Sequence, residues 1–220
     1  MSLQIKNGQV VNPLEMTVAK TDLFLQDGKI VGLGSAPKNF KAEQTIDAAD
    51  QWVLPGLIDC QARLRDPGEP EKANIESETK AAIENGITSL CIPPDTQPPI
   101  DNSATVELIH HRNEMFGHQA QVYPIGALTR GLGGEQLSNM ASLRDNGCIA
   151  FSNAKIPLAN NLVQRRAMDY AGGQQSLVII QPIDHDLLAN GCAHEGAVAT
   201  RLGLPAIPEA AETAALAKDI

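Results

Sequence analysis

The pattern of apolar and polar residues along the chain changes near residue 52. Before that point, LQIKNGQVV and DLFLQDGKIVGLG alternate apolar and polar positions around an Asn-Gly pair (residues 7–8) and an Asp-Gly pair (residues 27–28). Such pairs between alternating segments are strong signals for β-hairpins. We therefore predict two hairpins and interpret residues 1–52 as a small all-β domain.

After residue 52, continuous apolar runs alternate with segments of helical periodicity. Because a strand buried on both faces has no polar side, such runs predict the strands of a parallel sheet. The apolar runs are 53–61, 87–93, 121–129, 148–153 and 176–182, and the helical segments between them are 71–86, 103–117, 134–147 and 161–173. Ser103 is the expected N-cap of the second helix, and Gly86 is the expected stop of the first.

Parallel strands joined by helices predict either an open sheet or part of a barrel. A closed eight-stranded (β/α) barrel usually takes about 250 residues, more than residues 53–220 can supply. The last residues, AIPEAAETAALAKDI, have the pattern of an amphipathic helix with no closing signal. We therefore predict an α/β fold in which a partial TIM-type (β/α) barrel over residues 53–220 follows the all-β domain of residues 1–52.

Composition narrows the function classes. The formal charge of −9 argues against nucleic-acid binding, which would normally show as a basic face. No apolar run approaches about 18 residues, so we expect no membrane span, and the first residues lack the profile of a signal peptide. The four cysteines form no CxxC pair. These features favour a cytoplasmic protein whose cysteines are free thiols.

The carboxyl ends of barrel strands carry the catalytic groups of such enzymes. Here those ends read DCQARLR, PDTQ, GALTR, FSNAK and QPID. Together with LANGCAHEGAVATRLGLPAIPEAAE, and above all through the phrases RLRDPGEP and DTQPPID, the chain resembles the dihydroorotases of the amidohydrolase superfamily over essentially its whole length. The resemblance implies a metal-dependent barrel beside a small, sandwich-like β-domain.

Active members of that family bind one or two zinc ions through His-x-His after the first barrel strand, an acidic residue or carbamylated lysine after the fourth, and a histidine ending the fifth. The corresponding positions here hold Gln61, Arg63, Asn153 and Gln181, and Lys155 lies past the expected place. An amide oxygen is a weak zinc ligand, and a guanidinium repels a metal ion. We therefore expect neither zinc nor any other cofactor, and no catalytic residue.

The substrate-binding positions of the family are better preserved. The resemblance places Arg65 where the family's arginine pairs with the substrate carboxylate, a role that suits a guanidinium. Asp95 replaces the family's asparagine, and its negative charge would repel that carboxylate. Arg65 and Asp95 are therefore interpreted as vestigial substrate-binding residues.

Two hypotheses follow from the resemblance. The first is a non-catalytic homologue, oligomeric, that helps to assemble aspartate carbamoyltransferase by binding its catalytic chain, as inactive homologues in some bacteria do. The second is an active metal-dependent cyclic amidohydrolase, a dihydroorotase or a related enzyme, with altered ligands. A truncated fragment without a role of its own is the remaining interpretation.

The five histidines do not change this choice. His110 and His111 lie within a predicted helix beside an arginine, as on a solvated face, and His118 precedes the third strand on the side of the barrel that serves stability. His185 and His194 flank a loop at a spacing that fits no compact ligand motif.

Overall fold

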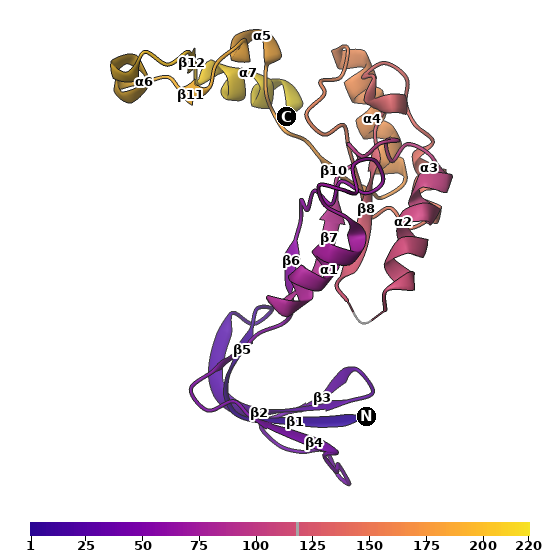
Figure 1. The fold of residues 1–220 in the computed structure, drawn as a ribbon, viewed down its shortest axis with the longest axis vertical. Coiled ribbons are helices and arrows are strands. Elements are labelled where there is room, and N and C mark those ends of the chain that lie inside the picture. The colour runs from indigo at the N-terminus through magenta and orange to yellow at the C-terminus, as the bar shows by residue number, and fades with distance from the viewer. Residues whose placement is uncertain (118) are drawn as a thin grey trace. The chain divides into compact units, whose positions relative to one another are not determined.

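The computed structural model describes residues 1–117 and 119–220, which form two compact units, residues 1–57 and 58–220 (Figure 1). The boundary between the two units lies after Leu57, whereas the change in sequence pattern predicts it after Trp52. The difference arises because the short strand at Trp52–Val53 pairs with the first strand of the chain and so belongs to the first unit.

The first unit is a single five-stranded mixed sheet. The strand β1 lies in its middle, pairs antiparallel with β2 and parallel with β4 and β5, and β3 extends the sheet beyond β2. Its strands are β1 (Ser2–Asn12), β2 (Thr17–Gln26), β3 (Lys29–Leu33), β4 (Gln44–Asp47) and β5 (Trp52–Val53). The prediction of a small β-rich part before the barrel is confirmed.

Of the two predicted hairpins, only the second exists. Asp27 and Gly28 connect β2 to β3, both with positive φ, as a tight hairpin turn requires. The first prediction is wrong, because the Asn-Gly pair at residues 7–8 lies inside the continuous strand β1. There the register with β2 shifts between Ile5 and Gly8, so the pair forms a β-bulge and not a turn.

The bulge is fixed by its surroundings. Asn7 has φ 61°, its backbone N–H donates to Asp22 Oδ1 at 3.1 Å, and its side-chain amide donates to Asp47 Oδ1 at 3.0 Å. A Cβ on Gly8 would lie 2.5 Å from Val53 Cγ2, so only glycine lets β5 approach. The same residue types suit a hairpin turn and a bulge. Here β1 pairs with β2 on both sides of the Asn-Gly pair, so the pair lies in a bulge.

The second unit contains the partial barrel. Its sheet has the order β10-β9-β8-β7-β6, and the pairs β7–β8, β8–β9 and β9–β10 are parallel. The strands are β6 (Leu57–Asp59), β7 (Ile87–Ile92), β8 (Gln121–Ala127), β9 (Ala150–Ser152) and β10 (Leu177–Ile179), and the helices between them are α1 (Ile75–Glu84), α2 (Ser103–Met115), α3 (Met140–Asp145) and α4 (Asn161–Gly173). This sequential order of strands is that of a (β/α) barrel, and the prediction of a partial barrel is confirmed.

The segment after β10 forms three helices and a pair of two-residue strands. They are α5 (His185–Leu188), β11 (Ala193–His194), α6 (Ala197–Leu202), β12 (Ala206–Ile207) and α7 (Ala210–Asp219). Earlier in the chain, the 3₁₀-helix η1 (Arg130–Leu132) follows β8. β11 and β12 pair in parallel, and α5 packs against α7. In the described part of the chain, no helix has both the length and the apolar character that crossing a bilayer needs.

Each helix that covers the sheet begins at an asparagine. The side chains of these N-cap residues accept hydrogen bonds from backbone N–H groups of the first turn, which have no partner within the helix. The caps are Asn74 for α1, Asn102 for α2, Asn139 for α3 and Asn160 for α4. Ser103, the predicted cap of α2, is its first helical residue instead, because the Asn102 side chain reaches Thr105 N at 3.1 Å.

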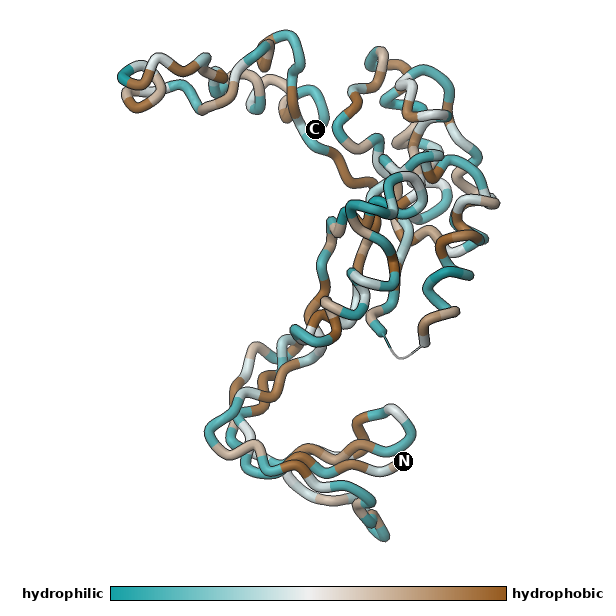
Figure 2. Tube along the Cα trace, viewed as in Figure 1, coloured by the Kyte–Doolittle hydropathy of each residue, from teal (hydrophilic) through white to brown (hydrophobic). Residues whose placement is uncertain are grey.

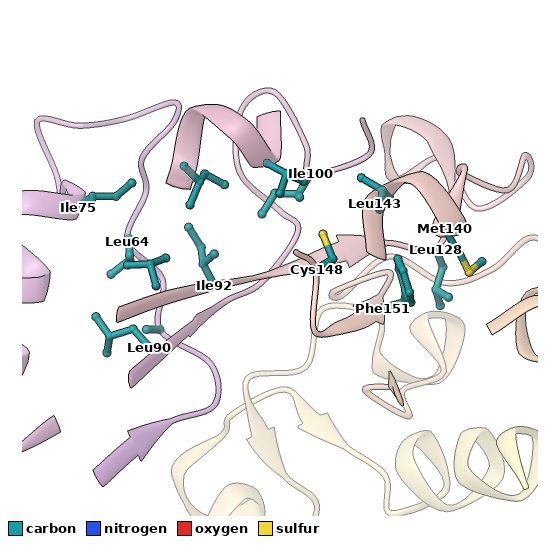
Figure 3. Packing of buried hydrophobic residues seen from close by; sticks show 14 of the residues in the cluster. Leu64, Ile75, Leu90, Ile92, Ile100, Leu128, Met140, Leu143, Cys148 and Phe151 are labelled. Carbon is teal, nitrogen blue, oxygen red and sulfur yellow. The ribbon is translucent and has the colours of Figure 1, made fainter. Parts of the chain in front are cut away.

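The sheet of the second unit has two apolar faces. Successive side chains of a strand point to opposite faces, so Phe151 belongs to a core shared with the helices while Ala150 belongs to a smaller cluster on the other side. We call these the outer and the inner face. Figure 3 shows the outer core, with Phe151, Leu128 and Met140 close together. The helices over it carry both apolar and polar residues, as expected of helices with one buried side (Figure 2).

A substitution at Gly126 in β8 can test how tightly the outer core is packed. A Cβ there would lie 2.7 Å from Phe151 Cε1 and 3.2 Å from Leu143 Cδ1. Because Phe151 is fully buried and cannot move away, we expect Gly126→Ala to lower the free energy of unfolding by about 1–3 kcal/mol, measured by urea denaturation. Gly172→Ala is the matched control, since nothing lies within 4 Å of its Cβ position in α4. An equal loss of stability in both variants would contradict tight packing at Gly126.

Candidate functional site

A cleft of about 620 Å³ lies at the carboxyl ends of the barrel strands. Ile125 and Ser152 line it, and both belong to the inner face of the sheet. The full lining consists of Cys60, Gln61, Arg63, Pro93, Ile125, Ser152, Ala154, Lys155, Ile179, Ile180, Gln181 and Pro182. A cleft of this size, with apolar walls and a few polar groups, suits a small molecule.

Three of the four positions expected to hold metal in relatives meet in this cleft. Gln61 and Arg63 come from the segment after β6, and Gln181 comes from the segment after β10. Two hydrogen bonds hold the first segment: Gln61 N donates to the side-chain oxygen Asp59 Oδ1 at 2.9 Å, and Ala62 N donates to the backbone carbonyl of Cys91 in β7 at 2.9 Å. The sheet therefore fixes the position of Gln61 and Arg63.

Arg63 and Asp95 form an ion pair at this end of the sheet. Arg63 Nη1 donates to Asp95 Oδ2, and about a quarter of each side chain is exposed, 26% and 28%. The second terminal nitrogen, Arg63 Nη2, is buried and has no hydrogen-bond partner among the described residues. The carboxylate of Asp95, expected to repel a substrate anion, is therefore neutralised by the cation of Arg63, a residue at a position where the family resemblance implies a metal ligand.

A second ion pair supports the loop between β6 and α1. Asp66 is 5% exposed; its Oδ1 accepts from Arg112 Nη1 in α2, and its Oδ2 accepts from Ile75 N at the start of α1. On the same loop Gly68 lies against Gln97, and a Cβ there would be 2.9 Å from Gln97 Cβ. The loop that follows β6 is thus joined to α1, α2 and the loop after β7.

Arg65 is exposed and is not among the residues that line the cleft. Its φ is 57°, and its carbonyl accepts from Glu69 N at 2.7 Å in the turn that follows. The structure therefore separates the two residues that the sequence analysis interprets as substrate-binding: Asp95 pairs with Arg63, and Arg65 lies at the surface.

Asn153 is buried and fully engaged within the protein. Thr129 Oγ1 donates to its Oδ1 at 2.7 Å, and its Nδ2 donates to the carbonyl of Ile156 at 3.0 Å. It follows Ser152 and so falls on the opposite side of the chain, against a second cavity of about 310 Å³ and not in the cleft. Lys155 lines both spaces.

The histidines lie apart from the cleft wherever they are described. His185 Nε2 hydrogen-bonds the carbonyl of Lys155 at 2.9 Å, and His110 packs against Gly147. His111 is exposed on α2, and His194 is exposed in β11. The prediction for His118 lies outside the described residues. No group of three or more His, Cys, Asp or Glu side chains suited to a metal ion occurs in residues 1–117 and 119–220.

The sequence model of the family described as Dihydro-orotase-like matches residues 50–220. The chain belongs to this family. A "Dihydroorotase-like protein" of Pseudomonas aeruginosa is 48% identical to it over 220 residues, which are all of this chain and 52% of the relative. A second protein of that name, from Pseudomonas putida, is 46% identical over the same span, again 52% of its length. A "Dihydroorotase" of Syntrophotalea carbinolica is 39% identical over all of this chain and 51% of its own.

This dihydroorotase-like chain therefore spans about half the length of the curated relatives that it matches. Among solved structures, a D-hydantoinase (dihydropyrimidinase) from Thermus sp. superposes with a TM-score of 0.71 at 18% identity, covering 99% of this chain and 48% of that one. A second D-hydantoinase structure gives 0.69 at 22% identity, with 99% and 49% covered. At these identities the likeness establishes the fold alone.

The donor set of the cleft does not fit the zinc ion that the dihydroorotase family implies. Gln61 and Gln181 offer amide oxygens, which are weak ligands for zinc. Arg63 is a permanent cation already paired with Asp95, and a metal ion beside it would be repelled. Asn153, the fourth position, has its side-chain oxygen bonded to Thr129. None of these four side chains therefore offers zinc a strong and available ligand.

Sequence reasoning missed two features of this site. The pairing of Arg63 with Asp95 could have been suspected, because a cation and an anion replace neutral family residues at two strand ends. Ser152 in the cleft follows from the two-residue repeat of β9 once the inner face is known. The repeat does not by itself tell which face is the inner one.

The Asp66–Arg112 pair predicts a stability effect. Arg112→Leu leaves the buried carboxylate of Asp66 without its counter-charge, so we expect the free energy of unfolding to fall by about 2 kcal/mol; full burial would give more, but Arg112 is partly exposed. Denaturant unfolding measures the change. Arg165→Leu breaks the fully exposed Arg165–Asp169 pair and should cost less than about 0.5 kcal/mol. Similar losses in the two variants would contradict a supporting role for Asp66.

The thiols give a second prediction. Burial raises the pKa of the Cys148 thiol to about 12, and burial, with Cys60 and Asp59 nearby, raises the pKa of Cys91. Because the thiolate is the reactive form, iodoacetamide at pH 8 should label exposed Cys60 and Cys192 and spare the other two. Peptide mass spectrometry measures the labelling, and a urea-unfolded sample, in which all four react, is the control. Rapid native labelling of Cys148 would contradict its burial.

Proposed function

We propose that the protein is a non-catalytic dihydroorotase-like protein that serves as a structural partner in the assembly of aspartate carbamoyltransferase. The observation that carries the non-catalytic part is the Arg63–Asp95 ion pair. Family chemistry needs a metal ion to lower the pKa of a bound water and polarise the amide. A guanidinium can bind an anion but generates no hydroxide at neutral pH.

The relatives lend support of a second kind. The two that are 46–48% identical are named "Dihydroorotase-like protein", whereas those named "Dihydroorotase" in the comparisons are 34–40% identical. The chain is thus more similar to relatives named only as dihydroorotase-like than to relatives named as the enzyme. The assembly role and the pairing with the transferase catalytic chain rest on the family resemblance.

Metal content and turnover test the non-catalytic part. We expect the gene-encoded protein, purified without chelators, to contain far less than one zinc per chain and to show no turnover of dihydroorotate above a heat-treated sample. An active dihydroorotase carried through the same purification is the control for metal loss. Stoichiometric zinc together with turnover of dihydroorotate or a hydantoin would instead establish the alternative, an active cyclic amidohydrolase with altered ligands.

Association tests the assembly part. The protein is mixed with the aspartate carbamoyltransferase catalytic chain of the same organism, and size-exclusion chromatography with light scattering gives the mass of each species. We expect one larger complex that contains both chains, and transferase that is less active or less assembled without the partner. An unrelated acidic protein of similar mass is the control for charge effects. Separate elution at every concentration tested would overturn the assembly role.

A further inference from the structure

Four asparagines of the chain are each followed by a glycine, namely Asn7, Asn85, Asn146 and Asn190. An asparagine in this setting is chemically labile, because the backbone nitrogen of a residue without a Cβ can reach the asparagine's side-chain amide carbon. Attack by that nitrogen on Cγ expels ammonia and leaves a five-membered succinimide ring. Since the Asn-Gly pair is the same in all four places, differences in reactivity within the folded protein must come from the structure.

Hydrogen bonds hold three of the four side chains. At the end of α1, Asn85 Nδ2 donates to a backbone carbonyl one turn earlier in the helix at 2.8 Å, and Asn146 Nδ2 does the same at the end of α3, also at 2.8 Å. In the β-bulge of the first unit, Asn7 Nδ2 donates to Asp47 Oδ1 at 3.0 Å. Each of these amides must give up its bond before the ring can close, which slows the reaction.

Asn190 has no such restraint. Its side chain is exposed and takes part in none of the side-chain hydrogen bonds of the described residues. The attacking nitrogen does not distinguish it from the helix ends, because Gly86, Gly147 and Gly191 each donate to a backbone carbonyl three residues back, at 3.1, 2.9 and 2.9 Å. The free side chain therefore sets Asn190 apart.

The turn that contains Asn190 is also strained. The bond from Gly191 N to the carbonyl of Leu188 closes a four-residue turn, and its second residue, Ala189, has φ 45° and ψ −123°. These angles are those of the first central position of a type II′ turn, which glycine fills readily and alanine does not, because its Cβ is crowded at positive φ. Opening of the turn relieves this strain and frees the Gly191 nitrogen to approach Asn190 Cγ.

We propose that Asn190 is a site of spontaneous deamidation and the fastest of the four Asn-Gly pairs in the folded protein. The Gly191 nitrogen bonds to Asn190 Cγ, and its proton leaves with the amide nitrogen as ammonia. Water then opens the succinimide at either carbonyl and gives aspartate or isoaspartate, whose main chain runs through Cβ and Cγ and is one carbon longer. The modification depends neither on the Arg63–Asp95 pair nor on the assembly role.

The longer main chain of isoaspartate does not fit this place. Gly191 is packed so closely that a Cβ on it would lie 2.3 Å from Ile207 Cγ1 in β12 and 3.0 Å from the carbonyl oxygen of Leu188. The next residue, Cys192, donates its N–H to the carbonyl of Pro205 at 2.9 Å, and the pairing of β11 with β12 follows directly. We therefore expect isoaspartate to loosen the pairing of β11 with β12.

The test follows all four pairs in one sample. The gene-encoded protein is kept warm at mildly alkaline pH, and peptide mass spectrometry after digestion at acidic pH measures the conversion of each asparagine over time. We expect Asn190 to convert at least about fivefold faster than Asn7, Asn85 and Asn146, since one net hydrogen bond supplies roughly that factor. Protein unfolded in guanidinium chloride is the control, and there the four rates should be similar. Equal rates in the folded protein, or the same ranking in the unfolded protein, would overturn the proposal.

A variant at Ala189 tests the contribution of the turn. Ala189→Gly adopts the positive φ without strain, so the turn stays closed more of the time, and we expect Asn190 to convert several-fold more slowly. The rates at the other three asparagines should not change, which makes them the internal control. Circular dichroism of the fresh sample establishes that the variant is folded. An unchanged rate at Asn190 would overturn the role of the strained turn.

Proteolysis tests the structural consequence. As isoaspartate accumulates, measured by methylation with an isoaspartyl methyltransferase, limited proteolysis within residues 183–220 should become faster in the unmodified protein. Asn190→Gln is the control, because glutamine would have to form a larger ring and reacts more slowly. We expect its cleavage rate to stay constant over the same time. An equal increase in cleavage in Asn190→Gln would overturn the link between deamidation and loosening of β11 and β12.

Discussion

The two-residue repeat of the barrel strands is the constraint on which the second unit depends. Along β9 it places Ala150 and Ser152 on the inner face and Phe151 on the outer face, where the helices pack. At the end of β9, Ser152 lines the cleft, whereas the next residue, Asn153, lines the second cavity. A shift of one residue would exchange the core for the cleft.

The ion pair of Arg63 with Asp95 links two departures from the family that look independent in the sequence. Without Asp95, the charge of Arg63 would have no counter-charge beside it. Without Arg63, the carboxylate of Asp95 would repel anions. Together they neutralise each other across the ends of neighbouring strands β6 and β7. The two residues therefore form a fixed charge pair at the carboxyl ends of these strands.

Much of the fold could be predicted from the sequence, because apolar runs and helical periodicity indicate where strands and helices form. The expected burial of these runs on both faces was wrong for β6, which is exposed, and for β10, which is largely exposed. All five barrel strands and the helices between them lie within the predicted segments, and the Asp27-Gly28 turn is where its residues indicate. The prediction of a hairpin at Asn7-Gly8 was wrong, because a residue pair that favours positive φ suits a bulge as well as a turn. Pairing with β2, which lies farther along the chain, determines that a bulge forms. The cleft was harder to predict, since its pairing and its side-chain directions depend on neighbouring strands far apart in the chain.

The four asparagine caps have a consequence for the behaviour of this chain in acid. Helices are often capped by aspartate, whose carboxylate becomes a weaker acceptor when it takes up a proton. An amide does not titrate, so the starts of α1 to α4 keep the same acceptor at every pH. In a protein with 26 carboxylate side chains, protonation leaves these four amide acceptors in place, and only the start of α1 among the four is described as having a carboxylate acceptor as well, Asp66 Oδ2, which accepts from Ile75 N.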